Sequence, residues 1–346
     1  MKVLVLGGSG HIGNRLLEIL ASDFFPDIPT GASRAPLKSD AKGIDWIRLD
    51  TCNLVDLTLA LRRFDAVVNC VAGDAHSIST GTQVLVQAAL SAGCSRIIHL
   101  STMSVYGPVE GTVGEDAPLN SGLGWYGRAK CEAEQHISEF VRQGGHAVVL
   151  RPGCVFGPGS ELWVGRVGRW LRAGRLGDLG VGGDGWSNLV HVDDICQAVM
   201  AALKLQIKPG ELPIFNLSAP DSPRWNDYFV DLALALQFTP VRRIGRRQLQ
   251  LDAWLAGPPL KLAQKALRQA QSLPWSLPDP LSPGLLRLWA QHIQLDAQQA
   301  SQKLGMLWTP YAAGLKSSAG WMDGNEICIP GESARRPAFI ESRTFL

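Results

Sequence analysis

The amino-terminal stretch constrains the fold of this 346-residue chain more than any other part. Residues 2–6 form a short run rich in valine and leucine, which is typical of a buried strand, and the run ends at a glycine cluster. From Asn14 onward the apolar residues take helical spacing. A strand, a tight glycine turn and a helix can hold a dinucleotide pyrophosphate, because the turn lets the backbone approach the phosphates and the helix N-terminus favours their charge. The stretch therefore predicts a dinucleotide site.

The glycines of this turn follow the spacing G-x-x-G-x-x-G, at Gly7, Gly10 and Gly13, instead of G-x-G-x-x-G. A glycine-rich turn alone is a weak signal, but this one directly follows a strand and opens a helix. We expect the three glycines, together with His11 and Ile12, to bind the cofactor.

Strand-like and helix-like segments alternate at short spacing after the turn, which predicts an α/β protein with a doubly wound parallel sheet of the Rossmann type. We expect strand 27–34 to be irregular or to lie at an edge, because Pro29 falls inside it. The other segments that we expect are strands at 44–50, 66–73 and 96–102 and helices at 54–63 and from about 81 onward.

The end of the second strand selects the cofactor, since an acid there binds the ribose hydroxyl of NAD and an arginine accommodates the 2′-phosphate of NADP. No acid lies between Asp27 and Asp40, whereas Ser33, Arg34 and Lys38 offer a hydroxyl and two cations. NADP is therefore favoured over NAD. A basic, solvated loop is the alternative explanation.

Two further strand ends carry residues that we assign to the cofactor. Asp50 ends the third strand, where it can face the adenine amino group. Ala72 and Gly73 follow the strand at 66–73, and their small size lets the backbone lie against the nicotinamide ribose.

Tyr126 and Lys130 stand four residues apart, so a helix places both on one face. An ammonium beside a phenol favours the phenolate, and we expect it to lower the pKa of Tyr126. The pair can then exchange a proton with a carbinol oxygen while hydride moves at the cofactor. A lone Y-x-x-x-K occurs by chance, but here it follows both the glycine turn and a strand tipped by Ser101 and Thr102.

Composition bounds the class of protein. A hydrophobic share of 46%, a charged share of 18% and a net charge of +2 are ordinary for a globular chain. The small net charge predicts no bulk attraction to nucleic acid or to a membrane and no nucleic-acid partner. No apolar run approaches the roughly 18 residues that span a bilayer, so we expect no integral membrane segment and a cytoplasmic location. The seven cysteines are scattered without metal-ligand spacing, and we expect no metal site.

At this point the sequence resembles the extended short-chain dehydrogenase/reductase family, in its NAD(P)-dependent epimerase/dehydratase and 3β-hydroxysteroid-dehydrogenase-like branches. The resemblance implies that Thr102 is a catalytic hydroxyl, that Tyr126 is the acid/base and that Lys130 binds the nicotinamide ribose. It also implies cofactor contacts at Pro152 and Val155. The matching segments are Gly7–Gly13, Asp50, Asn69–Gly73, Ser101–Gly107, Tyr126 with Lys130, Arg151–Gly159 and His191–Asp194.

Two departures from the family pattern narrow the reaction. Members that dehydrate sugar nucleotides carry Asp-Glu after the catalytic hydroxyl, where this chain has Met103-Ser104, so dehydration is disfavoured. Sugar-nucleotide enzymes also tend to carry an arginine where this chain has Ser187, which loses a bidentate pyrophosphate clamp. Two explanations stay open for three nearby arginines, a compensating clamp or the solvated face of a helix. They are Arg166, Arg169 and Arg172.

The resemblance also implies a smaller, discontinuous substrate domain. We expect a Rossmann domain at 1–154 and 186–217, with Asp193-Asp194 capping a helix, a substrate domain at 155–185 and 218–322, and a tail at 323–346. Within the substrate domain, the amphipathic stretch 249–270 is interrupted at 257–259 and favours a lid or pocket helix over membrane contact. A homodimer through helices around 82–92 and 126–142 is a family expectation.

These observations lead to an NADP-preferring oxidoreductase that reduces a ketone, or oxidises a secondary alcohol, on a small to medium, rather apolar substrate. The first alternative is an epimerase that acts on a sugar nucleotide with tightly held NAD. The second is a dinucleotide-binding sensor without turnover. Retention of Thr102, Tyr126 and Lys130 together disfavours that sensor.

Overall fold

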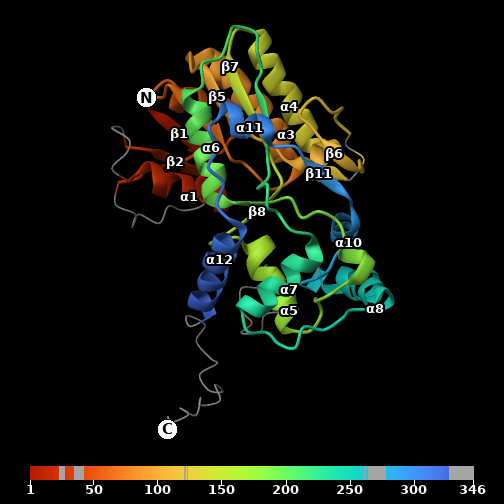
Figure 1. The fold of residues 1–346 in the computed structure, drawn as a ribbon. Helices are drawn as coiled ribbons and strands as arrows, with labels where there is room; N and C mark the ends of the chain where they lie inside the picture. The colour runs from red at the N-terminus through yellow and green to blue at the C-terminus, as the bar shows by residue number, and fades with distance from the viewer. Residues whose placement is uncertain are drawn as a thin grey trace, which may run out of the picture.

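The protein, seen in a computed structural model, has an upper part built around a sheet and a lower part made mostly of helices (Figure 1). The structure describes residues 1–22, 28–34, 43–120, 122, 124–260, 262–263 and 278–326. The described helices include none that is both long and apolar enough to cross a membrane.

A seven-stranded sheet forms the centre of the upper part, and all of its strand pairs are parallel. This confirms the predicted α/β fold with a doubly wound sheet. Because β1 lies between β2 and β4, the strand order reverses beside it, and such switch points are where ligands bind in open parallel sheets. From one edge to the other the strands are β10 (Ile214–Leu217), β7 (His146–Pro152), β5 (Arg96–Leu100), β4 (Ala66–Asn69), β1 (Val3–Leu6), β2 (Thr30–Ser33) and β3 (Asp45–Arg48).

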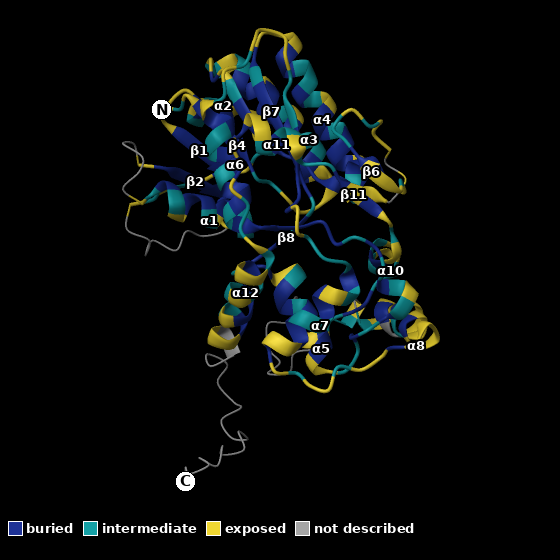
Figure 2. Ribbon diagram, in the orientation of Figure 1, coloured by how far each residue is buried: buried dark blue, intermediate teal, exposed yellow. Residues whose placement is uncertain are grey.

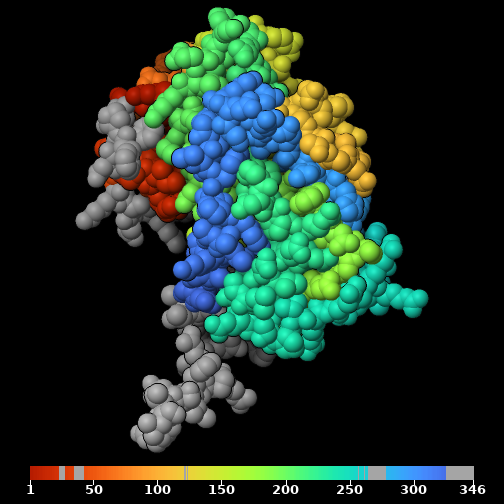
Figure 3. Space-filling view, viewed as in Figure 1, coloured from red at the N-terminus to blue at the C-terminus, as the bar shows by residue number. Residues whose placement is uncertain are grey.

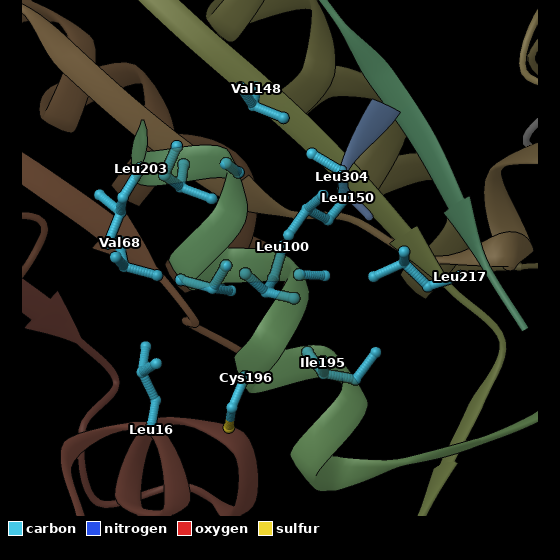
Figure 4. Close-up of a cluster of buried hydrophobic side chains, with 14 of the residues drawn as sticks. Leu16, Val68, Leu100, Val148, Leu150, Ile195, Cys196, Leu203, Leu217 and Leu304 are labelled. Atoms are coloured by element: carbon cyan, nitrogen blue, oxygen red, sulfur yellow. The ribbon is translucent and has the colours of Figure 1, made fainter. Parts of the chain in front are cut away.

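Helices cover both faces of this sheet. Alternate strand residues point to opposite faces, so neighbouring Val67 and Val68 belong to different hydrophobic clusters. One face packs against α1 (His11–Leu20) and α6 (Val192–Lys204), and Figure 4 shows Leu16 and Ile195 in this cluster together with Val68. The other face packs against α2 (Leu54–Leu61), α3 (Ala75–Ala92) and α4 (Trp125–Arg142).

The lower part has a core of its own, rich in tryptophan. Trp225 stacks on Phe229 with ring centroids 5.6 Å apart, and Trp289 meets both Phe229 and Trp170 edge-on. Trp170, Trp225 and Trp289 therefore serve core packing. The elements of this part are η2 (Glu161–Gly165), α5 (Arg166–Arg172), η3 (Gly180–Gly183), α7 (Trp225–Ala235), α8 (Arg246–Leu251), η4 (Asp252–Ala256), α10 (Pro283–Ala290) and α12 (Tyr311–Glu326).

Short elements join the two parts. The strands β8 (Cys154–Phe156) and β9 (Leu189–His191) pair with each other, as do β6 (Gly111–Val113) and β11 (Ile293–Leu295). After β11 the chain forms α11 (Gln298–Lys303), and Ala300, Leu304 and Met306 pack into the cluster on the sheet. The chain thus returns to the upper part within 218–322, and the division into domains stays a proposal.

Several expectations about local structure are corrected. Pro29 precedes β2, and this strand lies between β1 and β3, so it is neither irregular nor at an edge. The helix α3 begins at Ala75, before the expected start near 81, because the Asp74 side chain accepts a hydrogen bond from the N–H of Ser77 and caps it.

Two corrections concern the ends and continuity of other helices. The side chain of His191 caps α6 by accepting from the N–H of Asp193, so Asp193-Asp194 lies in the first turn instead of capping. The predicted interruption at 257–259 is absent, since residues 257–260 continue helically from η4. In the predicted tail, α12 extends to Glu326, and 327–346 lie outside the described residues.

Candidate active site

A cleft of about 920 Å³ runs along the carboxyl ends of the sheet strands and continues to the lower part. It takes lining residues from the turn after β1, the ends of β2, β4 and β5, the start of α4, the segment after β7, and α10. The structure brings most of the predicted site residues together there, namely Gly7, Gly10, His11, Ile12, Gly13, Ser33, Arg34, Ala72, Thr102, Tyr126, Lys130, Pro152 and Val155.

The glycine turn forms one end of the cleft. Gly7 has a φ of +74°, and a Cβ there would come within 2.9 Å of the carbonyl oxygen of Cys70. A Cβ on Gly13 would overlap the carbonyl oxygen of Gly7, so the turn and helix can meet this closely only with glycine. Gly10 caps α1 without any side-chain hydrogen bond, which leaves backbone N–H groups of the first turn available to an anion. These residues fit a dinucleotide pyrophosphate.

The end of β2 lies beside this turn. The hydroxyls of Ser33 and Ser9 are 3.0 Å apart, which ties β2 to the glycine turn. Arg34 is exposed and lines the cleft, and described residues 28–34 include no acid. Lys38 lies outside the described residues, so its predicted contribution stays a prediction.

Two predicted cofactor residues, Asp50 and Gly73, do not line the cleft. Asp50 is exposed, and its carboxylate accepts a hydrogen bond from the N–H of Cys52 at 3.0 Å, while Leu49 and Thr51 on either side reach the cleft. Gly73 follows the last lining residue of its segment. A turn places neighbouring residues in different directions, and sequence position alone did not resolve which of them face the cleft.

The start of α4 and the end of β5 bring the three predicted catalytic residues together. Lys130 is only 3% exposed, and its Nζ donates to the carbonyl oxygens of Leu100 at 2.6 Å and Val71 at 3.3 Å. The Thr102 side chain accepts from the N–H of Ser104 at 3.2 Å, and it interacts with the Tyr126 side chain. A hydroxyl, a phenol and an ammonium thus converge on one wall of the cleft.

Burial sets the protonation of this group. It raises the pKa of Tyr126 above its ordinary value, and the interaction with Thr102 only partly opposes that shift. The expectation that Lys130 lowers the pKa of Tyr126 is therefore wrong, because the ammonium is directed at backbone carbonyls instead of the phenol. Burial also lowers the pKa of Lys130 to about 8.

A buried polar network supports this wall from behind, and sequence reasoning missed it. Arg151 donates to both carboxylate oxygens of Glu134, at 2.6 and 3.0 Å, and to the Tyr106 hydroxyl at 2.9 Å. Glu134 also accepts from the Ser101 hydroxyl at 2.5 Å. Its place four residues after Lys130, on the same helical face, was a usable signal.

The opposite end of the cleft is largely apolar and was also not found from the sequence. Its lining comes from Met103, from Leu162 and Trp163 after β8, and from Leu285 and Leu288 of α10. Ser104 and Glu161 supply polar atoms there. These segments are far apart along the chain, so no local sequence pattern predicts that they line one cleft.

The positions considered for binding a substrate pyrophosphate lie away from the cleft. Ser187 is fully buried, and its hydroxyl donates to the carbonyl oxygen of Pro223 at 2.5 Å. Arg169 pairs with Asp279 at 2.7 Å and with Glu161. Arg166 lies near Asp279, and Arg172 lies over the ring of Phe238. None of the three arginines lines the cleft, so they do not form a compensating clamp. Their charged groups contact acids or a ring, so they are not simply a solvated helix face either.

With this geometry in place, the chain can be compared with known proteins. The family model described as the NAD dependent epimerase/dehydratase family matches residues 3–218. The chain belongs to this family. The match covers the glycine turn, the predicted catalytic residues and the strand β10.

The curated proteins that are similar to this chain include reductases. The 2-alkyl-3-oxoalkanoate reductase of Stenotrophomonas maltophilia (strain K279a) is 29% identical over 215 residues, which is 58% of this chain and 64% of the relative. The 2′-dehydrokanamycin reductase of Streptomyces kanamyceticus is 26% identical over 252 residues, which is 70% of this chain and 69% of the relative. The chain spans 64% of the length of the first of these relatives and 52% of the length of Protein YeeZ of Escherichia coli (strain K12), which is 33% identical over 158 residues. The 3β-hydroxysteroid-dehydrogenase-like branch stays a prediction.

Solved structures show the same fold. The UDP-glucose 4-epimerase of Thermotoga maritima has a TM-score of 0.73 and 18% identity, covering 94% of this chain and 100% of that chain. The UDP-glucuronic acid 4-epimerase of Bacillus cereus, solved with UDP-glucuronic acid and NAD, has a TM-score of 0.69 and 20% identity with the same coverage. The chain thus shares the fold of these two epimerases.

Proposed function

We propose that this chain is an NADP-preferring oxidoreductase that reduces a ketone, or oxidises the matching secondary alcohol, on a small to medium, largely apolar substrate. One observation carries the proposal. A single cleft holds the glycine turn at one end, Thr102, Tyr126 and Lys130 on its wall, and an apolar surface at the other end.

The predicted roles follow from the chemistry of the three side chains. The dinucleotide, when bound, supplies hydride to a carbonyl carbon or accepts it from a carbinol. Tyr126 gives its phenolic proton to the carbonyl oxygen, and its raised pKa keeps that proton in place at neutral pH. Thr102 orients the same oxygen by hydrogen bonding, and the Lys130 ammonium, held by the Leu100 carbonyl, presents donors for a ribose.

The preference for NADP rests on the end of β2. Arg34 is an exposed cation on the cleft wall, and the Ser33 hydroxyl lies next to the glycine turn. A guanidinium suits a phosphate because its donors can engage two oxygens at once. An acid at this position would instead favour the ribose hydroxyl of NAD.

The apolar end of the cleft supports the substrate class. Met103, Trp163, Leu285 and Leu288 favour a substrate that is apolar around its carbonyl. The names of two relatives, an oxoalkanoate reductase and a dehydrokanamycin reductase, also describe reduction. We therefore assign α10 and the loop after β8 to the substrate side and the sheet with α1 to the dinucleotide side.

A sugar-nucleotide epimerase is the second candidate, favoured by relatives such as the UDP-glucose 4-epimerase of Rhizobium meliloti (strain 1021), 24% identical over 252 residues. The burial of Ser187 weighs against it, because no cation at that position faces the cleft. A non-catalytic sensor is disfavoured by the intact group of Thr102, Tyr126 and Lys130.

Calorimetric titration with NADPH and NADH, after checking the absorbance for co-purified cofactor, tests this proposal. An NADPH preference of at least about tenfold, or about 1.4 kcal/mol, would support it. The second step follows NADPH oxidation with ketones of increasing apolar chain length, where kcat/KM should rise with chain length. Tightly retained NAD, with weaker NADPH binding, would contradict the proposal and favour the epimerase.

A further inference from the structure

The outer face of α8 and η4 exposes large apolar side chains. Leu251, Trp254 and Leu255 are 57%, 65% and 68% exposed, and their spacing places them along one side of the helical segment. Leu249 and Ala253, on the opposite side, are buried in the core of the lower part. Core packing thus explains only one of the two apolar faces.

The exposed face continues onto neighbouring elements. Val181 of η3 is 79% exposed, and a groove of about 490 Å³ separates α8 and η4 from α10. The groove is lined by Val181, Gly182, Arg246, Leu249, Gln250, Trp254, Pro283, Leu286, Arg287 and Ala290. We call the exposed apolar residues Val181, Leu251, Trp254 and Leu255 with Arg246, Arg247 and Arg287 the α8–α10 surface.

Cations surround these apolar side chains. Arg246, Arg247 and Arg287 are exposed, whereas the acid of this segment, Asp252, is bound by Arg175 at 2.6 Å. Between residues 240 and 270 the sequence has seven lysines and arginines and a single acid. The rest of the chain has 26 basic and 30 acidic residues, so positive charge concentrates in this segment.

The surface also projects from the molecule. Figure 1 places α8 at the outer corner of the lower part, Figure 2 colours much of it as exposed, and Figure 3 shows this region standing out from the body. A projecting helix can reach a flat partner without hindrance from the rest of the protein. None of the described residues of 246–260 lines the cleft, so the lid expected from the sequence is not formed by them.

We propose that the α8–α10 surface docks the protein on an anionic lipid bilayer. Trp254, Leu251 and Leu255 enter the boundary between headgroups and acyl chains, where tryptophan and leucine gain from partial burial. Arg246, Arg247 and Arg287 stay at headgroup level and neutralise phosphate charge. The partner is the bilayer surface itself, and the protein remains peripheral.

The position of α10 gives this docking a consequence for the active site. Its residues Leu285 and Leu288 line the active-site cleft, while Leu286 and Arg287 line the groove on the other side. Docking therefore brings the apolar end of the cleft close to the membrane surface, where apolar substrates concentrate. This consequence, unlike the docking itself, rests on the proposed function.

Flotation with lipid vesicles tests the docking. The full chain is mixed with phosphatidylcholine vesicles that contain phosphatidylglycerol, and separately with pure phosphatidylcholine vesicles. We expect co-flotation with the mixed vesicles only. The double variant Trp254→Ser/Leu255→Ser should lose at least about tenfold in partitioning, and each of the changes Arg246→Gln and Arg247→Gln about fivefold.

The matched control is Val55→Ser/Leu59→Ser, which removes two comparably exposed apolar side chains from α2 and should float like the unchanged protein. Dinucleotide affinity checks that each variant is folded, and Tyr126→Phe should float normally, which separates docking from the proposed catalysis. If the double variant does not fold, the arginine variants still test whether this surface binds the vesicles. Absence of flotation, equal binding to neutral vesicles, or a concentration-dependent dimer that disappears in Trp254→Ser/Leu255→Ser would overturn the proposal.

Discussion

The Nζ atom of Lys130 lies 2.6 Å from the carbonyl oxygen of Leu100, two residues before Thr102. This hydrogen bond joins the first turns of α4 to the end of β5, so the helix that carries Tyr126 and the strand that leads to Thr102 are held in one arrangement. The ammonium is buried, and among the described residues no carboxylate lies at hydrogen-bonding distance from it. Its charge state is therefore sensitive to pH in the range where enzymes are assayed.

The pH dependence of ketone reduction should report the ionisation of Lys130. Its pKa is lowered to about 8 by burial, so the side chain is charged below that pH and neutral above it. We expect kcat/KM for ketone reduction to fall as the pH rises through about 8. The pH profile of kcat/KM at saturating NADPH measures this.

The same lysine has the opposite effect on stability, which provides a control. Between about 8 and the ordinary lysine pKa, the unfolded chain binds a proton that the folded chain does not, so the contribution of Lys130 to stability rises with pH. Activity that fell only because the protein unfolded would be accompanied by a lower unfolding midpoint. An activity profile that stays flat through this range would contradict the role of Lys130.

Replacing Tyr126 with Phe should abolish turnover while leaving dinucleotide binding nearly intact. The change removes the acidic proton and keeps the ring, and loss of a general acid typically costs about 10²–10⁴-fold in rate. Steady-state kinetics and calorimetry on the same preparation measure both effects. Trp125→Phe, at the exposed neighbouring aromatic, is the control and should keep its activity. Full activity of Tyr126→Phe on the true substrate would show that another group moves the proton.

Arg34→Ala should weaken NADPH binding and leave NADH binding almost unchanged. A charge-assisted hydrogen bond contributes about 1.5–3 kcal/mol, which corresponds to roughly a tenfold to hundredfold loss in affinity. Titration calorimetry with both dinucleotides measures the change in selectivity. Arg48→Ala removes an exposed cation from β3 that does not line the cleft, and it should bind both as before. An equal loss for both dinucleotides would exclude Arg34 as the reader of the 2′-phosphate.

Glu134→Ala should destabilise the fold strongly, because it leaves the buried Arg151 without its carboxylate partner. The two side chains are 6% and 3% exposed, and breaking such a pair typically costs about 3–5 kcal/mol. Denaturant unfolding measures the free energy of unfolding. The control Glu139→Ala removes the carboxylate of an exposed ion pair with Arg142 on the same helix and should change that energy by less than about 1 kcal/mol. Equal costs for the two variants would mean that the buried network does not support the wall of the cleft.

Much of the fold could be predicted from local pattern. Apolar runs such as Val3–Leu6 and Ala66–Asn69 are buried strands. The glycine turn that follows the first strand is also present, and a Cβ on Gly13 would overlap the backbone of that turn. The spacing of Tyr126 and Lys130 predicted that both lie on one face of a helix, and in the structure both line the cleft. These features are local, because strand burial, turn geometry and helical facing depend on residues close together in the chain.

The protonation of the site required the tertiary structure. Nothing near Lys130 in sequence indicates that its ammonium is held by Leu100 and Val71, which come from two other strand ends. Because the spacing alone does not reveal these partners, it predicted that Lys130 lowers the pKa of Tyr126. In the structure, burial raises that pKa. Desolvation depends on everything packed around a group, and this packing comes from segments far apart along the chain.

The sequence by itself thus determined the parallel sheet, the glycine turn and the facing of Tyr126 and Lys130 on one helix, since each depends on short-range spacing and chain geometry. Only packing in three dimensions decided that Leu285 and Leu288 of α10 line the cleft, that Asp50 stays outside it, and that Glu134 meets Arg151. Contacts of this kind join residues that are distant in the chain. The contribution of α10 to the cleft arises because the lower part, with an apolar core of its own, meets the sheet at the carboxyl ends of the strands.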